Sequence, residues 1–300
     1  NSVAGNTVLG ESALDAAVTG NFNTSIGKNS LTANTAGDRN VALGYETLFT
    51  NTVGDRNVAI GMQALYSQNP ASNTDMNNVA IGHSSAFNTT TGINNTAVGT
   101  NTLFANTTGT NNTAVGSASL DAATTAANNT AVGYQAMTDQ TTGSDNSAFG
   151  KGALANNTTA NSNCAFGSNA LFTQTSDGTK NSAFGNSTLY SNTTGDSNVA
   201  IGDASLYTNT TGSENIAIGD YAMGANTTGA YNVAIGDGAL AANTTANNNT
   251  AIGKEALKLN TTGTLNVAVG AYALDAATTA TANTAVGIYA LSSSTTGSEN

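Results

Sequence analysis

The chain has 300 residues, of which 44 are Asn and 50 are Thr, and only 8% are charged, against about 25% in an ordinary soluble domain. Its formal net charge of −11 argues against nucleic acid and anionic membranes as partners, because both are polyanions. No apolar run approaches the roughly 20 residues of a membrane helix, so we expect no membrane insertion by this segment.

An internal repeat runs through the whole chain. With its glycine as position 0, each copy reads Asn-x-Ala-(Val/Ile/Phe)-Gly-x-x-(Ala/Ser/Thr)-Leu and ends in Thr-Thr-(Gly/Ala). Successive glycines are 17 residues apart, except for intervals of 21 (Gly61 to Gly82) and 18 (Gly167 to Gly185). Both insertions follow the Leu position, which predicts irregular outer loops near residues 66–77 and 172–180. The repeat glycines are Gly10, Gly27, Gly44, Gly61, Gly82, Gly99, Gly116, Gly133, Gly150, Gly167, Gly185, Gly202, Gly219, Gly236, Gly253, Gly270 and Gly287.

The first predicted element of each copy is a strand from position −4 to position 0. Position −4 is always Asn, position −2 is Ala in fifteen of the seventeen copies, and position −1 is always Val, Ile, Leu or Phe. This pattern predicts a strand buried on both faces, with the residue at position −1 as a core anchor. Stacked copies would align identical residues, so that the asparagines form a ladder of amide hydrogen bonds.

In the second half of the repeat, position +4 is Leu in fourteen of the seventeen copies, and a Thr-Thr-(Gly/Ala) corner follows it. We expect the leucines to be core and each copy to hold two short strands and two turns. The predicted structural ladders include Asn112, Asn129, Asn146, Gly116, Gly133, Gly150, Leu103 and Leu120.

These features predict an all-β fold, a parallel β-solenoid or β-roll of about seventeen 17-residue rungs,. Residues 1–300 form one repetitive domain in this prediction. Because one short rung encloses little core, we expect several chains to pack side by side as a homotrimeric fibre. The pattern runs on to Asn300, so we expect the chain to be a segment of a longer protein.

The motif Asn-Val-Ala-Ile-Gly, present at 57–61, 78–82, 198–202 and 232–236, resembles the YadA-like head repeats of trimeric autotransporter adhesins. Asn-Thr-Ala-Val-Gly-Tyr-Gln-Ala-Met at 129–137 is similar to repeats of bacterial surface proteins and phage tail-fibre proteins. The resemblance implies a left-handed parallel β-roll in three chains, located outside the cell on a bacterial surface or a virion.

Catalytic chemistry has little support in the sequence. His83 is the only histidine, and a single imidazole builds neither a triad nor a zinc site, so we expect an exposed side chain. Cys164, the only cysteine, is expected to be a small strand residue, with a reactive or intermolecular thiol as the alternative. The Asp and Glu residues are scattered and provide no pair of carboxylates at one site, which a glycosidase requires. No cofactor is predicted. Asp38-Arg39 and Asp55-Arg56 occupy the same places in adjacent copies, so we expect a diagonal surface ion pair of Asp38 with Arg56 or of Arg39 with Asp55.

Three surface ladders have functional alternatives. Asp203, Asp220 and Asp237 occupy position +1 of consecutive copies and would form a hydrated acidic edge or a weak calcium site. The Thr-Thr pairs beside the corner glycines could bind ice on a regular face. Aromatic residues recur at position +5 and would stack on each other or on a neighbouring chain, or form a platform for a host-surface glycan. These aromatic residues are Phe49, Tyr66, Phe87, Phe104, Phe172, Tyr190 and Tyr207.

The sequence therefore predicts a non-enzymatic fibre or adhesin of a bacterial cell surface or virion, which mediates attachment through a host glycan or protein. A self-assembling extracellular filament subunit is the alternative, and a ligand-binding or ice-binding solenoid is a more remote one.

Overall fold

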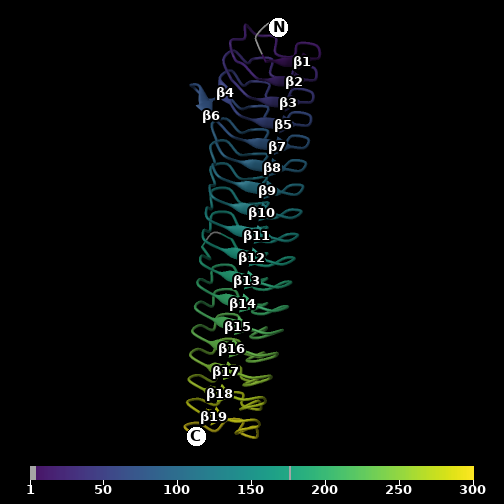
Figure 1. Ribbon diagram of the computed structural model, residues 1–300. Helices are drawn as coiled ribbons and strands as arrows, with labels where there is room; N and C mark the ends of the chain where they lie inside the picture. Colours follow the sequence, from purple (N-terminus) through teal and green to yellow (C-terminus); the bar gives the residue numbers. More distant parts are fainter. Residues whose placement is uncertain (1–4, 176) are drawn as a thin grey trace. The chain divides into compact units, whose positions relative to one another are not determined.

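The computed structural model describes residues 5–175 and 177–300 and consists of strands and turns, with no helix in these ranges. The chain divides into two compact units, Asn1–Asn146 and Ser147–Asn300. Each unit is a parallel β-solenoid in which one copy of the repeat makes one rung (Figure 1). This confirms the predicted all-β solenoid class.

The first unit stacks one strand per repeat, paired in parallel so that equivalent positions of neighbouring copies face each other; Ala97, for example, pairs with Ala114. A separate parallel pair joins β4 (Gly54–Asp55) to β6 (Thr74–Asp75), so the longer insertion adds a strand where we predicted an irregular loop. The stacked strands are β1 (Thr7–Leu9), β2 (Thr24–Ile26), β3 (Val41–Leu43), β5 (Val58–Ile60), β7 (Val79–Ile81), β8 (Thr96–Val98), β9 (Thr113–Val115) and β10 (Thr130–Val132).

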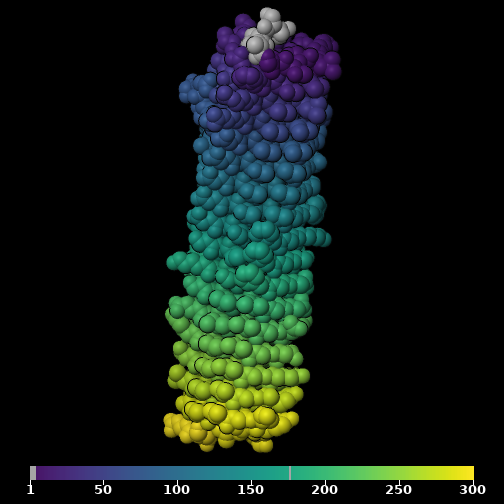
Figure 2. All heavy atoms as spheres, in the orientation of Figure 1, coloured from purple at the N-terminus to yellow at the C-terminus, as the bar shows by residue number. Residues whose placement is uncertain are grey.

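The second unit repeats this arrangement, with Ala217 paired to Ala234 as a typical register. Its successive rungs form parallel bands on the face shown in Figure 2. Its strands are β11 (Ser147–Phe149), β12 (Cys164–Phe166), β13 (Ser182–Phe184), β14 (Val199–Ile201), β15 (Ile216–Ile218), β16 (Val233–Ile235), β17 (Thr250–Ile252), β18 (Val267–Val269) and β19 (Thr284–Val286).

Most rungs contain one three-residue strand, so the prediction of two strands per copy was wrong for them. The physical reason is that positions +2, +4 and −5 adopt left-handed backbone conformations, as in Ala118 (φ 53°), Leu120 (φ 50°) and Asn128 (φ 59°). Such a residue cannot continue a strand. No β-branched residue occupies these three positions in any copy, although the chain contains 50 threonines. Left-handed φ is especially unfavourable for β-branched side chains, which explains why position +4 is Leu, Met or Ala and never Val or Ile.

The repeat glycine meets two demands at once. Gly116 has φ 127°, a conformation that other residues rarely adopt, and a Cβ atom added there would overlap the carbonyl group of Gly133 in the next rung. Any side chain at this position would therefore both strain the backbone and push the rungs apart.

In most rungs the core includes the alanine at position −2 and the residue at position +4, as in the fully buried Ala131 and Leu103. Position −1 points outward instead: Ile235 is 36% exposed and Phe184 39% exposed. The predicted burial of the strand on both faces is thus wrong for the single chain. Alternate residues of a strand face opposite sides, and only the side that carries position −2 is buried within the rung. Positions −3 and −1 share the outer face.

Candidate functional surfaces

From Asn23 to Asn283 the asparagines at position −4 are buried, and within each unit they form a column along the inside of the corner. The backbone N–H and the Nδ2 of Asn129 both donate to Oδ1 of Asn112, at 3.1 and 3.2 Å, and the Oδ1 of Asn129 accepts the backbone N–H of Asn146 at 3.0 Å. Its Nδ2 also donates to the carbonyl oxygen of Gly143 at 2.9 Å. Each asparagine therefore links its own rung to the one before it and closes its own corner.

A second set of buried amides, at position +7, was missed by the sequence analysis. Its longest unbroken run of asparagines extends from Asn192 to Asn260, and several other copies carry Ala, Thr, Gln or Ser at this position. Asn226 donates from Nδ2 to Oδ1 of Asn209 at 2.7 Å and to the carbonyl oxygen of Gly229 at 3.0 Å. The same carbonyl accepts Nδ2 of Asn215 from the first column at 2.8 Å. The signal was present in the recurrent Asn-Thr-Thr-Gly corner. Because the side-chain nitrogen of Asn226 is buried and hydrogen-bonded, its Asn-Thr-Thr sequon cannot accept a glycan in the folded chain.

The outer face of each sheet is a surface of two columns, at positions −3 and −1, which we call the sheet face. Every residue in these columns is uncharged: Thr, Ser, Cys, Val, Ile, Leu or Phe. The aliphatic members remain substantially exposed in the single chain, as Ile201 (40%) and Ile252 (37%) show. The position −1 column is apolar in every copy, whereas position −3 is Thr or Ser in nine of the seventeen. An exposed apolar column of this kind is typical of a protein interface.

The aromatic residues at position +5 form stacks within each unit. Phe49, Tyr66, Phe87 and Phe104 follow one another with ring centroids 4.9–5.3 Å apart and nearly parallel planes. Phe172, Tyr190 and Tyr207 form a second stack, with both centroid distances 5.2 Å. Since neighbouring rings cover each other's faces, the stacks present mainly ring edges to solvent. A sugar that packs on a ring face would find that surface only at the ends of a stack.

The three aspartates at position +1 lie one rung apart and do not converge on a common point. The backbone N–H of Asp203 donates to Oδ1 of Asp220 at 3.1 Å, and Nζ of Lys254 lies 3.8 Å from Oδ2 of Asp237. Asn186 donates from Nδ2 to Oδ1 of Asp203 at 3.0 Å. Among residues 5–175 and 177–300, no group of three or more His, Cys, Asp or Glu residues is arranged to hold a metal ion.

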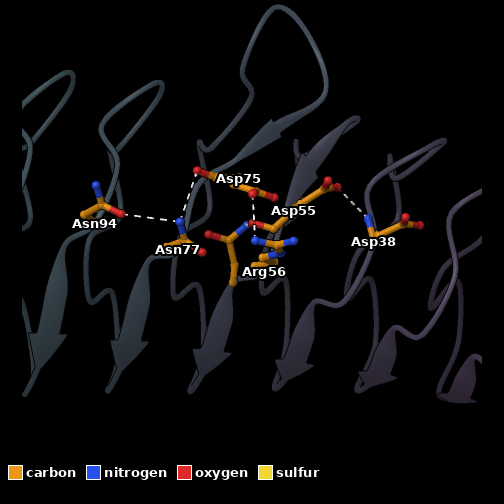
Figure 3. Close-up of polar contacts among 7 residues, drawn as sticks. Asp38, Asp55, Arg56, Asp75, Asn77 and Asn94 are labelled. Carbon is orange, nitrogen blue, oxygen red and sulfur yellow. Dashed lines mark hydrogen bonds and ion pairs between the residues drawn. The ribbon is translucent and has the colours of Figure 1, made fainter.

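The longer insertion carries a small polar cluster in the first unit (Figure 3). Arg56 pairs with Asp75 at 2.7 Å, so the predicted ion pair between Asp38 and Arg56 was wrong. The cause is β6, which places Asp75 opposite Asp55 in the neighbouring strand. The backbone N–H of Asp38 donates to Oδ1 of Asp55 at 2.7 Å, and Asp55 is buried. Burial raises the pKa of the Asp55 carboxyl group above its ordinary value,.

The two residues considered for chemistry belong to different units. His83 is exposed, and its backbone carbonyl accepts the N–H of Asn101. Cys164 lies half-buried in the position −3 column of the sheet face, and burial raises the pKa of its thiol. A raised thiol pKa reduces the thiolate fraction at neutral pH and therefore the reactivity of the sulfur.

No protein-family model and no curated protein matches the chain. The described part of the structure contains no helix that could span a membrane, and no pocket is found in it. The sheet face and the aromatic stacks are thus the candidate functional surfaces.

Proposed function

We propose that this chain is a segment of a non-enzymatic surface fibre, the shaft or head of a trimeric adhesin on a bacterial cell or of a virion tail fibre, which mediates attachment. The observation that carries the proposal is the sheet face, an uncharged surface with one wholly apolar and partly exposed column, on a chain with a formal net charge of −11. Copies of one chain repel each other through like charges. The uncharged strip is the surface on which they approach at least electrostatic cost.

Burial of this strip supports side-by-side association. Transfer of apolar surface out of water stabilises by roughly 25 cal/mol per Å², and each rung adds its own pair of outer side chains, such as Val233 and Ile235 in β16. The gain from one rung is small, but it repeats along every stacked rung. A homotrimer, in which three sheet faces surround a common axis, would remove this surface from water in a closed assembly.

The interior of the rungs supports a structural role. Within each unit, the buried asparagines at position −4 are hydrogen-bonded from rung to rung, and a shorter run of asparagines at position +7 is hydrogen-bonded in the same way. Each rung contacts mainly its neighbours, so a solenoid of this kind can lengthen by adding copies. The resemblance of the repeat to adhesin heads and tail fibres points the same way. Attachment would use the surface opposite the sheet face, with a host glycan or protein as the partner.

Mass photometry of the recombinant chain tests the assembly. We expect one species at three times the chain mass of 29.7 kDa. Lys at Ile201, Ile218, Ile235 and Ile252 together places four charges on consecutive rungs of the sheet face and should give a folded monomer. The matched control carries Lys at the exposed corner threonines Thr211, Thr228, Thr245 and Thr262 and should remain trimeric. A monomeric parent would contradict the proposal, and open-ended polymers would favour the filament alternative.

Flow cytometry with labelled protein tests attachment. Three linked copies bind a cell surface with higher apparent affinity than one copy, because later contacts are intramolecular. We expect the parent to be retained on host cells and the monomer with Lys at Ile201, Ile218, Ile235 and Ile252 to be washed off. Equal retention of both would show that association is unrelated to attachment, and retention of neither would remove the adhesin role.

A further inference from the structure

One tract of the sheet face differs from all others. Position −1 is Phe in the three consecutive strands β11, β12 and β13, and it is aliphatic in every other copy. The rings of Phe149 and Phe166 stack with centroids 4.5 Å apart, and those of Phe166 and Phe184 with centroids 5.1 Å apart. They form a continuous ridge on the outer face, and Phe184 is 39% exposed.

The same three strands carry the smallest side chains of the neighbouring column. Position −3 is Ser147, Cys164 and Ser182 here, whereas every other copy has Thr, Val or Ile. Residues two apart in a strand point to the same face. A ridge of three rings therefore lies beside a row of three small side chains.

The interior of the solenoid does not explain why position −1 carries large rings and position −3 carries small side chains in these three strands. The inward residues of the three strands, Ala148, Ala165 and Ala183, are fully buried alanines as in other rungs. The parallel register is also unchanged, with Ala148 opposite Ala165 and Ala165 opposite Ala183. The variation is confined to the outer face and concerns whatever that face meets.

We propose that this tract is a register key for association with further copies of the same chain. The ridge of Phe149, Phe166 and Phe184 on one copy packs against the row of Ser147, Cys164 and Ser182 on the next, at the same level. The inference rests on the proposed association through the sheet face and adds its register and direction. Copies then lie parallel and level, as closed rotational symmetry about an axis along the stack requires.

The rest of the face explains why a key is needed. From β14 to β18 the outer columns hold Val, Ile and Thr in nearly uniform succession. A slip by one rung there exchanges one β-branched side chain for another of similar size, so these rungs discriminate weakly between registers. In the tract, a slip of one rung moves an end ring of one copy from a small partner to a β-branched one. Overpacking of this kind is costly, and each large ring also loses buried contact area.

Cross-linking between copies tests the register. Three single-cysteine chains are needed: the parent with Cys164, and two Cys164→Ser variants with Ser147→Cys or Ser182→Cys. Two forms distinguished by tag length are refolded together and treated with a short bifunctional thiol reagent. Cysteines at the same position in two copies (147–147, 164–164 or 182–182), which we call like pairs, should cross-link roughly tenfold more than the unlike 147–182 pair. The reason is that two rungs separate the unlike pair by about 10 Å along the stack.

Variants then test whether the rings set this register. In the cysteine chains, Phe149, Phe166 and Phe184 are replaced together by Val, which position −1 already accepts at Val98, Val115 and Val132. We expect unlike pairs to cross-link nearly as well as like pairs. The matched control replaces Ile201, Ile218 and Ile235 by Val and should keep the like-pair preference.

The outcomes separate the two proposals. A parent chain that is monomeric by mass photometry would remove both the proposed assembly and the register key. An assembled parent that cross-links like and unlike rungs equally would overturn only the level, parallel arrangement. A like-pair preference that survives the triple Phe→Val change, with circular dichroism showing folded chains, would overturn the role of the rings.

Discussion

Replacement of Asn129 by Asp tests the buried amide column most directly. The Nδ2 of Asn129 donates to two oxygens, Oδ1 of Asn112 and the carbonyl oxygen of Gly143, while its Oδ1 accepts the N–H of Asn146. A carboxylate only accepts hydrogen bonds. Asn129→Asp would therefore direct a negative oxygen at two acceptors inside a fully buried site.

The expected loss of stability is about 3–5 kcal/mol at neutral pH, the usual cost of an unpaired buried charge. Protonation restores one donor, so in acid the loss should fall to about 1–2 kcal/mol, that of a single unmade hydrogen bond. Burial would raise the pKa of the new carboxyl group in the folded state above the unfolded value of about 4. The deficit relative to the parent is then smallest below that unfolded pKa and grows as pH rises toward the folded one.

Thermal and denaturant unfolding of parent and variant at pH 3 and pH 7 would measure this difference. The matched control is Asn111→Asp, since Asn111 belongs to an exposed amide stack at position −5, where Asp145 already occurs. We expect the control to change stability by less than about 0.5 kcal/mol at either pH. If Asn129→Asp behaved like the control, or if its deficit were equal at both pH values, the argument from buried donors would be refuted.

Three further predictions concern the core and the insertion. Leu103→Ala should cost about 2–5 kcal/mol by cavity formation and admit protease cleavage near residues 99–112; resistance equal to that of the parent would mean that position +4 is not core. Leu120→Ile should destabilise the chain by roughly 1–3 kcal/mol, because a β-branched residue would have to adopt φ 50°,. The control Leu120→Met, which matches Met137 in the same column, should cost less than about 1.5 kcal/mol. Equal denaturation midpoints for the two variants would contradict the backbone argument. Burial raises the pKa of Asp55, so ionisation of this carboxyl group destabilises the fold increasingly as pH rises above about 4. The melting temperature of Asp55→Asn minus that of the parent should therefore be more positive at pH 7 than at pH 3. A difference that does not change with pH would contradict this prediction.

The sequence by itself determined the class of fold and the identity of the main columns. A strict 17-residue period with unvarying Asn and Gly is compatible with stacked rungs and with little else, because only stacking brings equivalent positions together. It also located the leucine column in the core and the aromatic residues of position +5 in one row, where they do stack. These properties depend on periodicity alone.

Only the tertiary structure decided which way the residue at position −1 points and how each rung turns. A three-residue strand with Val-Ala-Ile, as in β16, fits a doubly buried strand as well as one with a single buried face, since its alternation is too short to distinguish them. The left-handed conformations at positions +2, +4 and −5 left a signal in the absence of β-branched residues, but its meaning depends on backbone angles. Those angles are held by hydrogen bonds between rungs, such as that from the N–H of Leu120 to the carbonyl of Ala136. Such contacts join residues distant in sequence, and for that reason local composition does not specify them.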